Sequence, residues 1–260
     1  MSEDGFLRME NVLKEFPGVV ANDHVNLSVK RGEVHGLLGE NGAGKSTLMK
    51  ILYGLYSQDA GNIYLDGELL DLDSPQDAID AGIGMVHQHF MLIPRLTVAK
   101  NIVLGEREPA TMFRPDADTE SWLPSSVRSN GLFQSLAGHF SLGLDVPEQR
   151  IQRLADQYGF DIDVNAKIWE LDVGQQQRVE ILKALYRDVD LLILDEPTAV
   201  LTPNEAERLF DSLERLADEG LSIIFITHKL KEIKAITDRV TVLREGVNVG
   251  TVATFTPSLR

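Results

Sequence analysis

The sequence predicts an α/β fold in which a mostly parallel sheet is covered by helices. Strand-like apolar runs alternate with helix-like segments along much of the chain, and such alternation is typical of parallel sheets. A glycine-rich motif over residues 39–47 stands between an apolar strand and an amphipathic helix. A second apolar run, Leu191–Leu194, leads directly into Asp195 and Glu196, as expected of a buried strand that brings polar side chains to the edge of an open sheet.

The first part of the chain predicts a small antiparallel sheet and the beginning of the main sheet. Its first two strands are joined by a loop that holds Phe16, Pro17 and Gly18. Thr97 is placed to act as the N-cap of a later helix. In order, we expect strands over 6–12, 25–29 and 33–38, a helix over 46–55, strands over 62–67 and 83–86, and a helix over 97–104.

The second part begins with a segment of different composition. Residues of about 106–145 hold three prolines, several serines, and Gly131 and Gly138, which predicts an insertion or a loop. Strand–helix alternation then resumes. We expect helices over 148–158 and 175–186, a strand over 189–194, a helix over 203–219, a strand over 221–227, a helix over 229–236, and a strand over 239–243 that enters a hairpin towards Val249.

Composition limits the classes to which the chain can belong. Its 260 residues suffice for one large domain, and the absence of cysteine excludes disulfides. Asp and Glu number 40 against 25 Lys and Arg, a formal charge of −15, which disfavours nucleic acid as a partner because phosphates attract basic patches. The first residues do not resemble a signal peptide, and no apolar run could span a bilayer. We therefore expect any membrane role to be peripheral.

The glycine-rich motif fits the phosphate-binding pattern G-x-x-x-x-G-K-[ST]. Glycines let successive backbone N–H groups point at phosphate oxygens, and the following helix N-terminus adds partial positive charge. Lys45 would reach the β- and γ-phosphates, and Ser46 would bind Mg²⁺. A glycine-rich turn that merely precedes a helix would not need the two glycines, the lysine and the serine at the fixed positions of this pattern. The expected ATP-binding residues are Gly39, Glu40, Asn41, Gly42, Ala43, Gly44, Lys45, Ser46 and Thr47.

Three other predicted strands end in side chains that suit phosphoryl chemistry. Asp195 would help to hold Mg²⁺, and Glu196 would orient and deprotonate the attacking water. His228 ends a strand where contact with a γ-phosphate is expected, and Gln88 would contact Mg²⁺ or the water. The candidate catalytic residues are therefore Glu196, His228 and Gln88, and the candidate metal ligands are Ser46, Gln88 and Asp195.

His87 and His89 flank Gln88 and raise the question of a separate metal site. Two histidines without a third ligand near them in the sequence are a weak signal for such a site. We therefore do not expect one.

The segment Leu171-Asp172-Val173-Gly174-Gln175 opens a predicted helix. It is similar to the Leu-Ser-Gly-Gly-Gln signature of the ATP-binding cassette (ABC) transporter family, and we call it the signature segment. With the phosphate motif, Gln88, Asp195-Glu196 and His228 in this order, the chain resembles the nucleotide-binding subunit of an ABC transporter over nearly everything except about 106–145. The segments 16–23, 82–92 and 197–203 resemble the branch that takes up simple sugars and nucleosides.

This resemblance implies a specific domain organisation. It implies a P-loop NTPase core of the RecA-like type, with an antiparallel β subdomain and an inserted α-helical subdomain, in a single ABC ATPase domain over 1–260. The core with its β subdomain would comprise 1–95 and 186–255, and the helical subdomain 96–185. In this family an aromatic residue of the first sheet stacks on adenine, and Phe16 stands in the matching segment. Packing of Phe16 in the core is the alternative.

The resemblance also implies partners and cofactors. ATP and Mg²⁺ would lie between the phosphate loop of one cassette and the signature segment of a second, so a homo- or heterodimer of ATPase domains is expected. Dimer closure would drive transmembrane permease subunits, with the cassette on the cytoplasmic face of the cell membrane and a solute-binding protein outside. The alternatives are a soluble ABC ATPase of translation or DNA repair, and a regulatory cassette with weak turnover. The acidic charge and the lack of a heptad run disfavour the soluble class.

Four features depart from the family pattern, one of them Val173, which stands where the family often has Gly. Asp172 stands where the family has Ser, and an ionised carboxylate cannot donate to a γ-phosphate; unit charges ~4 Å apart repel by about 4 kcal/mol at an effective dielectric constant of ~20. Thr202 stands where Asp is frequent. The chain ends at Arg260, whereas members of this branch commonly carry two cassettes, so it could be a single-cassette subunit, a fragment or the product of a split gene.

The acidic excess has two explanations: a solubilising surface, or adaptation to high salt, where screening makes self-repulsion tolerable. If the second is correct, the chain loses structure when salt is removed by dialysis, because the 40 carboxylates then repel one another without screening. Far-UV circular dichroism before and after dialysis measures this loss, with restoration of salt as the control. Full stability at low ionic strength would reject adaptation to salt.

Overall fold

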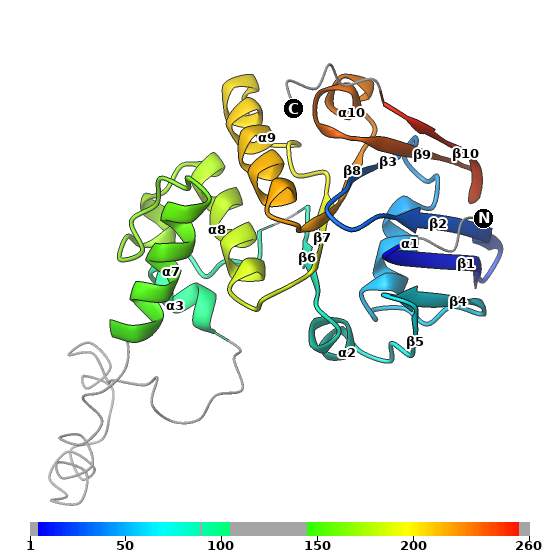
Figure 1. Cartoon of the computed structure of the whole chain (residues 1–260), viewed down its shortest axis with the longest axis horizontal. Coiled ribbons are helices and arrows are strands. Elements are labelled where there is room, and N and C mark those ends of the chain that lie inside the picture. The colour runs from blue at the N-terminus through cyan, green and yellow to red at the C-terminus, as the bar shows by residue number, and fades with distance from the viewer. Residues whose placement is uncertain (1–4, 89, 105–144, 255–260) are drawn as a thin grey trace, which may run out of the picture.

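The computed structural model describes residues 5–88, 90–104 and 145–254, and these build the expected α/β fold. Within them a six-stranded sheet has the order β10-β9-β3-β8-β7-β6, and a four-stranded sheet has the order β2-β1-β4-β5. Figure 1 shows α1 between the two sheets and α3, α7 and α8 grouped beyond β6 and β7. Within the described residues, no helix combines the length and the apolar character needed to cross a bilayer.

The six-stranded sheet is parallel except at β10, which pairs antiparallel with β9. Every residue of β6, β7 and β8 is buried, which explains why these segments are continuous apolar runs rather than alternating ones. The strands are β3 (Val34–Leu38), β6 (Ile83–Val86), β7 (Leu191–Asp195), β8 (Ser222–Thr227), β9 (Arg239–Arg244) and β10 (Val247–Ala253).

The four-stranded sheet is antiparallel throughout. Its strands are β1 (Leu7–Phe16), β2 (Val19–Val29), β4 (Ala60–Leu65) and β5 (Glu68–Leu70). The expected loop between the first two strands is wrong in extent, because both strands continue to a two-residue turn at Pro17 and Gly18. Strand β5 was not predicted. It is short and exposed over Glu68 and Leu69, so its sequence shows no apolar alternation.

The helices agree with the sequence in type, with small shifts at their ends. Thr97 caps α3 as expected, because its side chain accepts from the Lys100 N–H. Helix α2 and the short η1 were not expected, and the expected irregular segment over 106–145 lies almost entirely outside the described residues. The helices are α1 (Lys45–Leu52), α2 (Pro75–Asp80), α3 (Val98–Val103), α7 (Asp145–Gln157), η1 (Ile168–Glu170), α8 (Val173–Leu185), α9 (Pro203–Asp218) and α10 (Leu230–Ile236).

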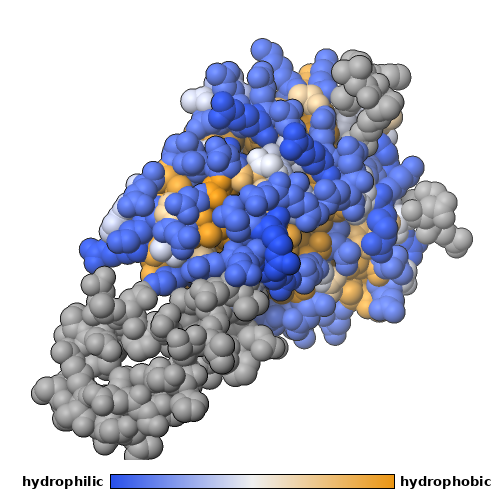
Figure 2. All heavy atoms as spheres, turned by 60° about the vertical axis from the view of Figure 1, so that its left-hand side comes forward, coloured by the Kyte–Doolittle hydropathy of each residue, from blue (hydrophilic) through white to orange (hydrophobic). Residues whose placement is uncertain are grey.

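Two hydrophobic cores lie on opposite faces of the six-stranded sheet. Alternate residues of β7 point to opposite faces, so Leu191 and Ile193 pack towards α1 and the small sheet, while Leu192 and Leu194 pack towards α8 and α9. Outside these cores the surface is mainly hydrophilic on the face shown in Figure 2, with apolar residues between the polar ones. The division of the chain at residues 96 and 185 stays a prediction.

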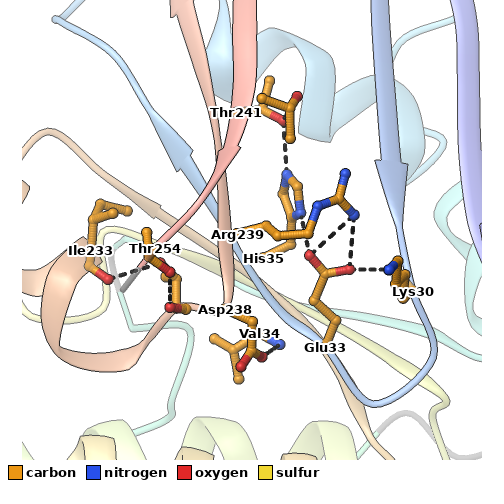
Figure 3. A network of polar contacts seen from close by, with 11 residues as sticks. Lys30, Glu33, Val34, His35, Ile233, Asp238, Arg239, Thr241 and Thr254 are labelled. Carbon is orange, nitrogen blue, oxygen red and sulfur yellow. Dashed lines mark hydrogen bonds and ion pairs between the residues drawn. The ribbon is translucent and has the colours of Figure 1, made fainter. Parts of the chain in front are cut away.

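A buried polar network ties β3 to β9 and β10 (Figure 3). His35 is fully buried; its Nδ1 lies 2.9 Å from Glu33 Oε1 and its Nε2 lies 2.8 Å from Thr241 Oγ1. Thr241 in turn bonds Thr251 at 2.7 Å, and the Arg239 guanidinium lies 3.2 Å from Glu33 Oε2. Side chains therefore fix β9 to β3, and β10 to β9, in addition to the backbone ladders.

We expect Glu33→Gln to destabilise the fold at neutral pH. Burial acts to raise the pKa of Glu33, but His35, the Lys30 N–H and Arg239 outweigh it and lower that pKa. A carboxyl with a lowered pKa stabilises the fold fully above its ordinary pKa of about 4.3, and this contribution is lost as the pH falls below it. The variant should lose ~2 kcal/mol at pH 7, the scale of a hydrogen bond to a charged group, and the deficit should shrink below about pH 4.

Thermal unfolding across this pH range, with Glu68→Gln on the exposed strand β5 as the control, measures the effect. A deficit that stays constant with pH would show that the charge of Glu33 is not what stabilises the fold.

Candidate phosphate and catalytic site

Parallel pairing brings four predicted site elements to one edge of the main sheet. The ladders align Leu38 with Thr227 and Leu194 with Phe225, so neighbouring strands end at nearly the same level. The phosphate loop follows β3, Gln88 follows β6, Asp195 and Glu196 end β7, and His228 follows β8. Side chains separated by more than a hundred residues in the sequence thus meet at the carboxyl edge, where open α/β sheets bind ligands.

The phosphate loop, residues 39–47, lies against the backbone of β2 and of β9. Gly44 has φ of +94°, and a Cβ there would lie 2.4 Å from the Ala21 carbonyl oxygen, so only glycine fits. The fully buried Asn22 donates its side-chain amide to the Gly44 carbonyl at 3.2 Å. A Cβ on Gly39 would lie 2.5 Å from the Leu243 carbonyl oxygen. The loop conformation therefore depends on two strands as well as on its own sequence.

A cavity of about 420 Å³ opens beside this loop. Lys45 is 6% exposed, and its Nζ donates to the Gly39 and Glu40 carbonyl oxygens at 2.7 and 2.9 Å. Burial lowers the pKa of Lys45, and the carboxylates of Glu196 and Asp195 partly oppose that effect. The cavity is lined by Val19, Val20, Ala21, Asn41, Gly42, Ala43, Gly44, Lys45, Ser46, Thr47, Gln88, Asp195 and Glu196.

Asp195 lines the same cavity as Lys45 and is 9% exposed. Burial raises its pKa, and Glu196 adds to the increase, while a hydrogen bond from Ser46 and the charge of Lys45 act in the opposite direction. A carboxylate, a hydroxyl and the Gln88 amide oxygen are hard oxygen donors of the kind that Mg²⁺ takes beside substrate phosphates. These three side chains line one cavity. They therefore fit a Mg²⁺ ion whose remaining coordination positions would be taken by phosphate oxygens.

Glu196 links the other two candidate catalytic residues. Its Oε1 lies 2.9 Å from His228 Nδ1, and its Oε2 accepts from Gln88 Nε2 at 3.3 Å. Glu196 has φ of +48°, an uncommon conformation for a residue with a side chain and one that is often retained at functional sites. Its N–H donates to the Ile226 carbonyl at 3.1 Å, so the neighbouring strand holds this backbone in place.

The signature segment, residues 171–175, is not among the residues that line the cavity of about 420 Å³ beside the phosphate loop, which we call the phosphate cavity. Asp172 is the N-cap of α8: it accepts from the Gln175 N–H at 2.7 Å, and Gln175 accepts from the Asp172 N–H at 3.1 Å. Leu171 and Gly174 are buried, whereas Asp172 and Val173 are exposed. Asp172 also acts to raise the pKa of Arg178, against the larger effect of burial. The carboxylate at the family's Ser position therefore caps α8 and lies near a cation.

Two residues considered from the sequence lie elsewhere. Phe16 is not among the residues that line the cavity; its ring packs edge-on against Tyr56 with centroids 5.5 Å apart, and stacking on adenine stays a prediction. His87 packs edge-on against Tyr53 with centroids 6.1 Å apart, and His89 lies outside the described residues. In the part of the chain that the structure describes, no group of three or more His, Cys, Asp or Glu side chains could hold a metal ion.

The segment after Glu196 ends in a second capping box. Thr202 caps α9: its hydroxyl donates to Glu205 Oε2 at 2.6 Å, and its N–H donates to the same oxygen at 2.7 Å. These bonds with Thr202, followed by a bond from the Gly174 N–H, lower the pKa of Glu205. Thr202, at the position where Asp is frequent, thus retains a helix-capping role and is tied to the signature segment.

Comparison with known proteins agrees with this geometry. The family described as "ABC transporter" matches residues 22–199. "Glucose import ATP-binding protein TsgD13" of Haloferax volcanii is 81% identical over 254 residues, which are 98% of this chain and 46% of that protein. "Guanosine import ATP-binding protein NupO" of Bacillus subtilis is 50% identical over 246 residues, which are 95% of this chain and 43% of that protein. The chain thus spans less than half the length of these relatives.

Solved structures show the same fold. A nucleotide-free ATP-binding cassette from an ABC transporter superposes with a TM-score of 0.77 at 24% identity, covering 96% of this chain and 92% of the other. The dimeric structure of MJ0796, a bacterial ABC transporter cassette, superposes with a TM-score of 0.71 at 25% identity, covering 95% and 98%. The family match shows that the chain belongs to the ABC transporter family, and the solved structures show that it has the fold of an ATP-binding cassette.

Proposed function

We propose that this chain binds and hydrolyses ATP as the energy-supplying part of an importer for a small solute. The observation that carries the proposal is the contact of Glu196 with both His228 and Gln88 at the edge of the cavity that the phosphate loop lines. Attack of water on a γ-phosphate requires a base and neighbouring polar groups beside the phosphate site. Glu196 would be the base, and His228 and Gln88 would be the neighbouring groups.

The chain's own residues suit defined steps. Backbone N–H groups of the loop and the Lys45 ammonium bind the β- and γ-phosphates. Lys45 gives up its hydrogen bonds to the Gly39 and Glu40 carbonyl oxygens when it does so. Glu196 orients the water and takes its proton, and His228 holds Glu196 on one side and faces the γ-phosphate. Mg²⁺, held by Ser46, Asp195 and Gln88, would neutralise charge that develops on the phosphate oxygens. Phe16 is proposed to stack on adenine.

The assembly is proposed from the same features and from the names of the relatives. Because residues 171–175 lie outside the phosphate cavity, they suit a role at the nucleotide of a second cassette, and the solved dimeric cassette supports such pairing. ATP-driven closure would shift transmembrane permease subunits between states, with the cassette on the cytoplasmic face of the membrane. The glucose and guanosine importers among the relatives favour a sugar or nucleoside delivered by a solute-binding protein.

A regulatory cassette with weak turnover is the second candidate, and the carboxylate of Asp172 favours it. In the assembled dimer this charge would face a γ-phosphate across the interface. The capping box that holds Asp172 on its own helix and the nearby Arg178 reduce the repulsion without removing it.

Glu196→Gln should abolish steady-state hydrolysis while ATP binding persists, because the amide keeps the shape of the side chain but cannot take a proton. A loss of about 10²–10⁴-fold in kcat is the scale of general-base catalysis. Release of phosphate by the purified chain, with and without permease subunits, measures kcat; light scattering reports the ATP-bound dimer that the variant should accumulate. Glu214→Gln, on the exposed face of α9, is the control. Normal turnover by Glu196→Gln would remove Glu196 from its proposed role.

Asp172→Ser should raise the ATPase rate of the assembled complex. Serine keeps the N-cap of α8 while it removes the negative charge and supplies a hydroxyl donor, so stability should change little. Asp172→Asn, which keeps both size and cap, separates charge from donor chemistry. Rates at or below that of the unchanged complex for both variants, with unaltered melting temperatures, would count against a repulsion penalty.

A further inference from the structure

We propose that Glu232 of α10 is a positioning residue for hydrolysis: its carboxylate fixes the segment that follows Glu196 to the strand end that carries His228. This inference rests on the proposed function, since it concerns the pair Glu196–His228. Glu232 itself is not among the residues that line the phosphate cavity, so its role would be to hold the catalytic pair together and not to touch the nucleotide.

Both carboxylate oxygens of Glu232 are occupied by threonine hydroxyls. Thr198 donates its hydroxyl to Glu232 Oε1 at 2.7 Å, and Thr227 donates its hydroxyl to Glu232 Oε2 at 2.7 Å. Thr198 lies two residues after Glu196, and Thr227 directly precedes His228. One side chain therefore anchors the two chain segments that must meet for the 2.9 Å contact between Glu196 and His228.

Lys229 closes the network on its remaining side. Its Nζ lies 2.9 Å from Glu232 Oε1 and 3.4 Å from Thr198 Oγ1, and its N–H donates to Thr227 Oγ1 at 3.0 Å. Each threonine hydroxyl therefore both donates and accepts, so neither can reverse its direction without losing a partner. The Glu232 side chain is only 12% exposed, and a charge with so little access to water needs to be paired and hydrogen-bonded. Lys229 and the two threonines meet this need.

The anchored positions are nearly inaccessible. Thr198 is 3% exposed and Thr227 is 2% exposed, so water cannot replace a lost acceptor. Thr227 also pairs with Leu38 in the ladder between β8 and β3, directly before the phosphate loop. The network thus fixes the Glu196 segment and the His228 turn against the strand that delivers the phosphate loop.

The chemistry of the network requires a carboxylate rather than an amide. Two hydroxyl donors need two acceptor oxygens, and a glutamine would present only one, because its nitrogen donates and cannot accept. Glu232→Gln has almost the same volume, so it should release one threonine without opening a cavity. A misplacement on the order of 1 Å can reduce a rate by ~10²-fold.

We therefore expect Glu232→Gln to lower kcat by about tenfold or more while KM for ATP changes little, because the residues that bind phosphate keep their contacts. Phosphate release gives both constants, and thermal unfolding shows whether the variant is folded. Glu219→Gln is the matched control: that exposed carboxylate also accepts a side-chain bond, from Gln157 at 2.5 Å, but lies at the end of α9. Its kinetics should be unchanged.

Thr198→Val and Thr227→Val test the network itself, because valine keeps the shape of threonine and removes the donor. Each should lower kcat, and the combination of Thr198→Val with Glu232→Gln should lower it by less than the product of the two separate effects, since both changes remove one shared interaction. Unchanged kcat in Glu232→Gln, or a fall in kcat that matches an equal rise in KM, would overturn the positioning role.

A readout without turnover separates this inference from the proposed function. The imidazole NMR signals of His228, assigned with His228→Gln, should shift in Glu232→Gln and stay in place in Glu219→Gln. If the unchanged chain neither binds nor hydrolyses ATP, the proposed function fails, and the shift still decides whether Glu232 positions His228. Unmoved His228 signals in a folded Glu232→Gln chain would reject the positioning role.

Discussion

In-register parallel pairing of β3, β8, β7 and β6 is the constraint on which the site depends. The ladders hold the ends of these strands at nearly one level, so whatever follows each strand emerges at the same edge. Burial of both faces supplies the free energy for this pairing, because Leu191 and Ile193 serve one core and Leu192 and Leu194 the other. A shift of one residue in β7 would exchange these two sets and move Asp195 away from Ser46.

Much of this arrangement could be predicted from local sequence. The buried strands were evident because their apolar runs are continuous and because Asp195, Glu196, His228 and Gln88 stand at their ends. The start of α1 was evident from the spacing of Lys45 and the glycines that precede the helix. Strand β5 and helix α2 were missed because both lie partly exposed and carry no strong apolar period. The structure adds the contacts of Glu196 with Gln88 and His228, which no spacing along the chain specifies.

Residues that support the site were harder to predict than the candidate nucleotide-binding residues. Asn22 bonds Gly44, and Glu232 joins the nearby Thr227 to the distant Thr198, so the sequence around either residue does not indicate its role. The capping role of Asp172 was different in kind: Asp at the cap with Gln three residues later is a capping-box pattern, and it was available from the sequence. That pattern explains how an acidic residue satisfies the helix end while it changes the charge that the helix presents.

Glu205 connects two segments that would lie beside different nucleotides in the proposed dimer. It accepts from Thr202 at the end of the segment that follows Asp195 and Glu196, and the Gly174 N–H of the signature segment also acts on it. The segment after Glu196 and the N-terminus of α8 are therefore joined through one side chain. In the dimer proposed above, displacement of the segment after Glu196 would move the N-terminus of α8, so a change at one nucleotide would reach the helix end that faces the other.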